Sequence, residues 1–137
     1  MSASLPSRDA SPWLRLVGLL ALAWTGLVFV LLWMPPPPPP EHIVWWWDKA
    51  VHAALMAGFG GLWTWAGRPG RWVLRWGLAM GAVTEVGQAL LPWERSSSLG
   101  DFGADVAGLL LGWLVARALW PWLPGVRGSR PPWWSPR

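Results

Sequence analysis

Eight charged or hydrogen-bonding side chains lie at or near the ends of apolar segments in this 137-residue chain. In chain order they are Asp48, Lys49, His52, Glu85, Gln88, Arg95, Asp101 and Asp105. A charged side chain near the centre of a membrane helix costs roughly 2.5–3.5 kcal/mol, so such residues face a protein interior or a wet cavity. We therefore predict that these side chains form one polar cluster.

The cluster has the residue types of a hard or borderline metal site, because it combines an imidazole with carboxylates. It lacks a tight ligand motif such as His-Glu-x-x-His, so we predict no metal and no cofactor. For acid–base or nucleophilic catalysis, no serine inside an expected helix lies beside a base, and Ser96–Ser98 fit a turn and a helix cap. We assign no catalytic residue, and the pattern favours a protein that is not an enzyme.

Composition indicates a membrane protein. Hydrophobic residues make up 53% of the chain and charged residues 13%, whereas about a quarter of a soluble domain is charged. The net charge of +4 comes from basic residues at the ends of apolar runs, with no basic and aromatic platform for a nucleic acid. The absence of cysteine excludes disulfides and thiolate metal sites. We predict a lipid bilayer as partner and no nucleic acid.

Four segments are long and apolar enough for helical crossings of about 20 residues. The predicted fold class is all-α, a polytopic membrane protein with four transmembrane helices in a compact bundle (13–120). We expect the helices at about 14–34, 49–66, 72–91 and 101–120, with a proline-rich outer loop at 35–47. The flanks are a cytoplasmic N-terminal segment (1–12) and a disordered basic tail (121–137). A signal peptide is the alternative for the first helix, but six prolines follow it in place of a cleavage site.

Two of these helices carry glycines at four-residue spacing, which allows close helix packing. They are Gly77, Gly81, Gly108 and Gly112. Asp101 and Asp105 continue the stripe of the second pair, so packing of that stripe would turn both carboxyls inward. Ser98 followed by Asp101 fits a helix N-cap with an acidic residue in the first turn.

The distribution of basic residues predicts the orientation. With four alternating crossings, nine of the eleven basic residues fall on one side, and only Lys49 and Arg95 fall on the other. The positive-inside rule then places both termini in the cytoplasm. The predicted polar cluster therefore lies at the outer leaflet.

The spacing of the polar residues resembles that of the VanZ-like membrane proteins. The recurring pattern is D-K-x-x-H, then E-x-x-Q, a turn with Arg, and D-x-x-A-[DN]-x-x-G-x-x-x-G. It is matched by Asp48, Lys49, His52, Glu85, Gln88, Arg95, Asp101, Ala104, Asp105, Gly108 and Gly112. The resemblance covers about half the chain, and Asp105 stands where Asn is most often expected. The resemblance implies the cytoplasmic membrane of a bacterium. The founding member of the family is associated with low-level teicoplanin resistance, and the family has no agreed biochemical mechanism.

Three functions are compatible with this pattern. In the first, Lys49 and Arg95 receive a phosphate or carboxylate, and neighbouring carboxyls accept hydrogen bonds from sugars or amines. A lipid-linked cell-wall precursor or a lipophilic glycopeptide would offer such groups. In the second, the polar residues are interhelical glue in a scaffold protein, which could also be a homo-oligomer. In the third, Glu85 and His52 relay protons in a small coupled transporter.

Overall fold

The computed structural model describes residues 12–35, 46–90 and 98–123, and this part of the chain is helical without strands. It contains α1 (Pro12–Trp33), α2 (Trp47–Trp65), α3 (Gly70–Leu90), α4 (Leu99–Leu119) and a short 3-10 helix, η1 (Trp120–Trp122). The predicted all-α class is confirmed. The first residues, most of the proline-rich loop, the turn containing Arg95 and most of the C-terminal tail lie outside the described residues.

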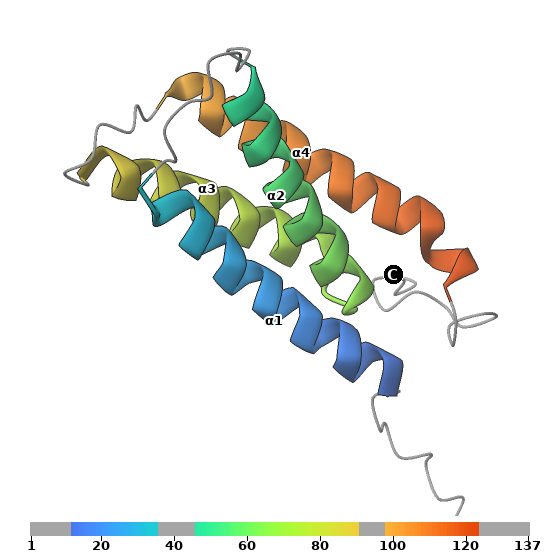
Figure 1. The fold of residues 1–137 in the computed structure, drawn as a ribbon. Coiled ribbons are helices and arrows are strands. Elements are labelled where there is room, and N and C mark those ends of the chain that lie inside the picture. The colour runs from blue at the N-terminus through green and yellow to red at the C-terminus, as the bar shows by residue number, and fades with distance from the viewer. Residues whose placement is uncertain (1–11, 36–45, 91–97, 124–137) are drawn as a thin grey trace, which may run out of the picture.

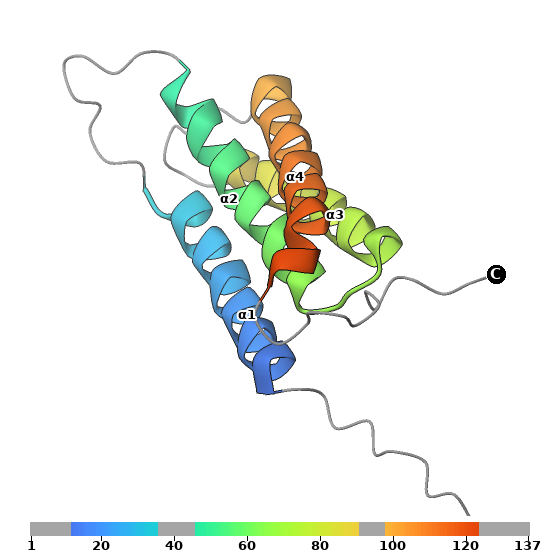
Figure 2. The same ribbon diagram turned by 90° about the vertical axis from the view of Figure 1, so that its right-hand side faces the viewer.

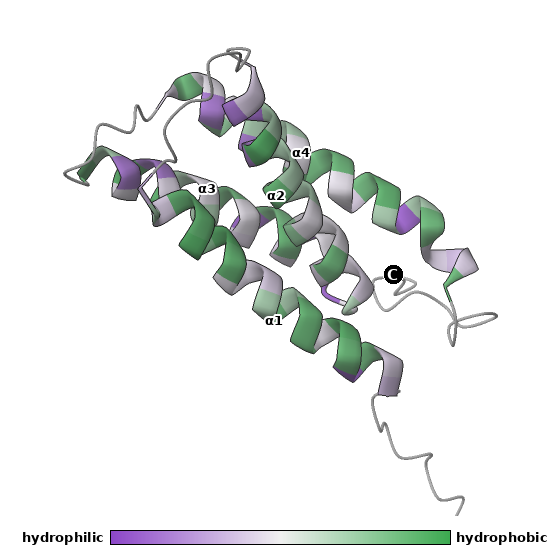
Figure 3. Ribbon diagram, viewed as in Figure 1, coloured by the Kyte–Doolittle hydropathy of each residue, from purple (hydrophilic) through white to green (hydrophobic). Residues whose placement is uncertain are grey.

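The four helices run in alternating directions, so the ends of α1 and α3 lie near the starts of α2 and α4 (Figures 1 and 2). α2 and α4 form the most extensive helix pair, α1 packs mainly on α2, and α3 packs mainly on α4. Colouring by hydropathy shows hydrophilic residues gathered where α2 and α4 start and α3 ends (Figure 3). We call this region the polar end of the bundle.

The helix bounds agree closely with the sequence-based expectation. Each helix begins two residues earlier and ends one residue earlier than predicted, as in α1, which covers 12–33 rather than 14–34. Local chemistry accounts for the early starts. Pro12 is the first residue of α1, where its missing N–H costs nothing. Ser98 is the N-cap of α4 and its side chain accepts a hydrogen bond from the Asp101 backbone, which confirms the predicted cap.

A glycine in the left-handed region follows the C-cap of α2. Gly67 has φ of 85°, which a residue with a Cβ rarely adopts. Its N–H donates to the Thr64 carbonyl, and the Arg68 N–H donates to the Trp63 carbonyl. These two bonds form a Schellman motif, which satisfies carbonyls that the helix leaves free. The turn between α2 and α3 is therefore tight and defined by its own sequence.

Glycine lets the backbones of α2 and α4 approach closely. A Cβ on Gly108 would overlap the backbone of Ala53, and one on Gly112 would overlap the backbone of Ala57. In the opposite direction, a Cβ on Gly60 would lie 2.6 Å from the carbonyl oxygen of Leu109. The two helices thus meet through backbone atoms, and this contact fixes their relative position.

The other predicted glycine pair lies on α3 and faces α4. A Cβ on Gly77 would lie 2.5 Å from the side chain of Leu109, so this glycine makes room for a core leucine. A Cβ on Gly81 would lie 3.3 Å from Asp105 Oδ2. Gly81 therefore leaves room for a carboxyl group of the polar cluster.

Tryptophan side chains link the helices by hydrogen bonds from their indole groups. Trp24 Nε1 donates to the Leu55 carbonyl across 2.9 Å, and Trp65 Nε1 donates to the Ala116 carbonyl across 3.0 Å. Buried indoles usually need such a partner. This role could not be predicted from the sequence, because the acceptors are backbone carbonyls with no sequence signature.

Two helical stretches, Pro12–Trp33 and Leu99–Trp122, are long and apolar enough to cross a membrane. Only 22% of the most apolar part of each is buried in the protein. α2 and α3 are less apolar than these two stretches, because they carry charged residues together with several tryptophans and glycines of lower hydropathy. Large hydrophobic side chains such as Leu19 and Leu111 remain exposed on the bundle.

Candidate functional site

A chain of hydrogen bonds crosses the polar end of the bundle from the surface inward. Lys49 Nζ donates to Asp101 Oδ1 across 2.9 Å, and Ser98 Oγ donates to Asp101 Oδ2 across 2.5 Å. The Ser98 backbone N–H donates to Glu85 Oε2 across 3.1 Å. Residues of α2, α3 and α4 are thereby connected through the N-cap of α4.

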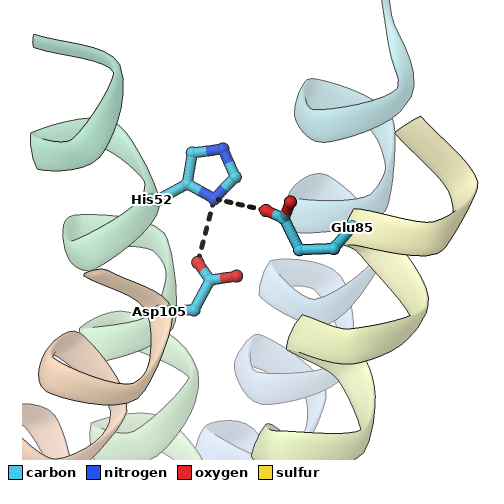
Figure 4. A group of neighbouring side chains, drawn as sticks. All are labelled: His52, Glu85 and Asp105. Carbon is cyan, nitrogen blue, oxygen red and sulfur yellow. Dashed lines mark hydrogen bonds and ion pairs between the residues drawn. The ribbon is translucent and has the colours of Figure 1, made fainter. Parts of the chain in front are cut away.

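The inner part of the network is a group of three side chains, His52, Glu85 and Asp105, each from a different helix (Figure 4). His52 Nδ1 lies 3.0 Å from Asp105 Oδ1 and 3.9 Å from Glu85 Oε1. One donor atom from each of the three lies within 4.8 Å of the others. We call this group the His–Glu–Asp cluster.

Burial increases along the network. The Lys49 side chain is 37% exposed and the Glu85 side chain 13%, whereas the His52 and Asp105 side chains are each 1% exposed. Within the described residues, Glu85 Oε1 and Asp105 Oδ2 are buried without a hydrogen-bond partner. A buried acceptor without a partner is costly, and a charged one more so. The cluster therefore holds two carboxylate oxygens that are available to a further group.

Helical spacing explains why these side chains meet. Asp101 and Asp105 are four residues apart on α4, and Lys49 and His52 are three apart on α2, so each pair shares a helix face. The backbone contact between α2 and α4 joins those faces in two layers. Lys49 meets Asp101 near the surface, and His52 meets Asp105 one turn deeper.

Gln88 lies at the polar end but bonds away from the cluster. Its Nε2 donates to the Leu32 carbonyl of α1 across 2.9 Å, and the side chain is buried. The residue four positions after Leu32 is Pro36, which has no N–H to continue the helix ladder. Gln88 supplies the missing donor. Gln88 was expected to join the other polar groups, but its side-chain amide bonds to this carbonyl of α1 instead.

Asp48 and Arg95 complete the predicted set. Asp48 is in the first turn of α2 and is exposed. Arg95 lies outside the described residues, so its predicted role stays a prediction. Ser98, which the sequence reading treated only as a cap, connects Asp101 to Glu85. The cap position of Ser98 could have indicated this contact, because an N-cap side chain is held close to an acidic residue in the first turn of the helix.

An apolar groove lies beside Glu85. Its volume is about 420 Å³, and it is lined by Ala82, Glu85, Val86, Ala89, Ser98, Leu99 and Phe102. Glu85 and Ser98 also belong to the hydrogen-bond network, so they join the groove to the buried cluster. We call this feature the Glu85 groove.

The arrangement offers three kinds of chemistry. The Glu85 groove can accept an apolar chain, and its carboxylate can accept hydrogen bonds from amines or hydroxyls. Lys49 can interact with an anion near the surface, although Asp101 already pairs with it. His52 between two carboxyls can exchange a proton or bind a cation.

No protein-family model, no curated protein and no solved structure matches this chain.

Proposed function

We propose that this chain is a multi-pass protein of the bacterial cytoplasmic membrane that binds an envelope amphiphile at its polar end. All four long helices cross the bilayer in this proposal, and both termini lie in the cytoplasm. The exposed apolar side chains of α1 and α4 support it, since a bilayer would cover them. Arg68, Arg71 and Arg117 lie toward the opposite end from the His–Glu–Asp cluster, as the positive-inside rule requires.

One observation carries the binding function: Glu85 lines an apolar groove and also belongs to a buried polar network. Polar groups that only joined helices would not need an apolar groove beside them. An amphiphile matches both parts, because its chain can lie against Ala82 and Phe102 while its head group donates hydrogen bonds to Glu85.

The ligand class follows from these groups. A lipid-linked cell-wall precursor and a lipophilic glycopeptide both combine an apolar chain with sugars or amines. Glycopeptide binding agrees with the resemblance to VanZ-like proteins, and we extend the proposal to a contribution to teicoplanin resistance. The two sources of amphiphile can be separated by binding each to the purified protein in lipid nanodiscs.

The test compares teicoplanin susceptibility in a sensitive host that expresses the wild type, Glu85→Gln or Ala82→Phe. Gln keeps the volume of Glu85 and removes its charge, whereas Phe fills the groove. Leu78→Phe is the matched control, because Leu78 lies one turn earlier on α3, is 41% exposed and does not line the groove. Membrane abundance of every variant is measured in parallel.

We expect the wild type and Leu78→Phe to protect the host, and Glu85→Gln and Ala82→Phe to lose most of this protection. Equal protection by all four proteins at equal abundance would contradict a role for the groove. It would favour the alternative in which the polar residues only hold the helices together.

A further inference from the structure

We infer that His52, Glu85 and Asp105 form a binding site for one divalent transition-metal ion, with Zn²⁺ as the best match. This inference goes beyond the proposed function, because ion binding requires no amphiphile. The sequence contains no metal motif, because the three ligand residues belong to different helices and come together only where α2, α3 and α4 meet (Figure 4).

The distances fit an ion with small side-chain movements. Bonds from Zn²⁺ to imidazole nitrogen and carboxylate oxygen are about 2.0–2.2 Å long, which in a tetrahedron separates neighbouring donor atoms by roughly 3.3 Å. The separations from His52 Nδ1 are 3.0 Å to Asp105 Oδ1 and 3.9 Å to Glu85 Oε1, and one ligand atom from each of the three residues lies within 4.8 Å of the others. Shifts of less than about 1 Å would bring these donors to bonding distance.

Free acceptor atoms provide a second and independent argument. Glu85 Oε1 and Asp105 Oδ2 have no hydrogen-bond partner among the described residues, and the Asp105 side chain is 1% exposed. Figure 4 shows the carboxyl groups of both residues directed toward the His52 ring. A cation between them would satisfy buried oxygens that otherwise lack a partner.

Charge balance favours the same conclusion. Asp101 pairs with Lys49, whereas in the described part of the chain the ion-pair partner of both Glu85 and Asp105 is His52. One imidazolium cannot neutralise two buried carboxylates, but a dication can. The hydrogen bond between His52 Nδ1 and Asp105 Oδ1 contains a proton, which leaves Nδ1 when an ion binds there: an imidazolium releases it to solvent, and a neutral ring carries it on Nε2 instead.

The donor types select the class of ion. One imidazole with two carboxylates suits a borderline ion such as Zn²⁺ better than Mg²⁺, which prefers oxygen ligands alone. Three protein ligands leave the fourth tetrahedral position for water or another ligand.

The test uses the full chain in nanodiscs, stripped with a chelator and then titrated with Zn²⁺ or Mg²⁺ alone. We expect one Zn²⁺ per chain by elemental analysis and a rise in the unfolding temperature with Zn²⁺ concentration. Asp105→Asn and His52→Gln should weaken Zn²⁺ binding at least about tenfold, since even indirect support of a ligand is worth 10–100-fold. Leu78→Phe, which is remote from the cluster, should bind Zn²⁺ like the wild type.

Folding is checked for each variant by its unfolding temperature without Zn²⁺ and by its elution volume. If one ligand variant does not fold, Glu85→Gln takes its place, because Glu85 is partly exposed and its loss disturbs packing least. The inference is overturned if the wild type does not bind Zn²⁺, if folded ligand variants bind it equally well, or if Mg²⁺ binds as tightly.

Discussion

At the scale of single residues, the two acidic side chains of α4 differ in their partners. Asp101 accepts hydrogen bonds from Lys49 and Ser98, so both of its oxygens are used. Asp105 uses one oxygen for His52 and leaves the other without a partner among the described residues. The outer carboxyl therefore has a structural role at the start of α4, and the inner carboxyl has capacity for a ligand.

This difference predicts unequal effects on stability. Asp101→Ala removes the acceptor for two donors and leaves the cap of α4 weakened, which should cost about 1–3 kcal/mol of unfolding free energy. Lys49→Met should lower stability less, because Asp101 Oδ1 loses its partner but the hydrogen bond from Ser98 and the cap of α4 remain. Thermal unfolding of both variants in nanodiscs measures the difference. Equal losses would contradict the structural role assigned to Asp101.

Much of the cluster could be predicted at this scale, because helical spacing and the cost of burying charge apply before any contact is known. Lys49, His52, Glu85, Asp101 and Asp105 were predicted together and lie in one network. Gln88 could not be placed, since its acceptor is a backbone carbonyl of α1. Any residue can present a backbone carbonyl, so the sequence gives no sign of which side chain will bond to it.

At the scale of helices, the contact between α2 and α4 depends on the absence of side chains. Gly108→Ala would place a methyl group within the backbone of Ala53, so the helices would have to separate. Overpacking of this kind costs about 1–3 kcal/mol. We expect a clear fall in unfolding temperature together with weaker Zn²⁺ binding, since His52 and Asp105 would move apart.

Gly103→Ala is the matched control on the same helix, because among the described residues no atom beyond its own stretch of helix lies within 4 Å of the added methyl group. Alanine in a helix is favoured over glycine by roughly 0.5–1 kcal/mol, so this variant should be as stable as the wild type or more stable. Similar losses in Gly103→Ala and Gly108→Ala would show that helix propensity, rather than the contact with α2, determines the effect.

Helix bounds were the most predictable property at this scale. Proline, glycine and an N-cap serine mark the ends locally, and no tertiary information is needed to read them. Which helices pack against each other was harder to predict from the sequence. The glycine stripes indicated that α4 packs closely on a neighbour, but the Ala53 and Ala57 surface that receives it contains no distinctive residue.

At the scale of the whole molecule, the proposed orientation places the polar end outside and the end of α4 in the cytoplasm. The chain contains no cysteine, so single cysteines can report accessibility without background. Leu99 is 93% exposed near the polar end, and Trp122 is 73% exposed at the opposite end. Leu99→Cys should react with a membrane-impermeant maleimide on intact cells, and Trp122→Cys should react only after lysis. The reverse pattern would contradict the orientation.

The backbone contact between α2 and α4 also determines which part of the site can adapt. His52 and Asp105 belong to the two helices that glycine holds together, and their distance of 3.0 Å is set by that contact. Glu85 belongs to α3, which packs less extensively and carries its carboxyl 3.9 Å from His52. Ions of different radius would therefore be accommodated by movement of α3, and the same movement would change the width of the Glu85 groove.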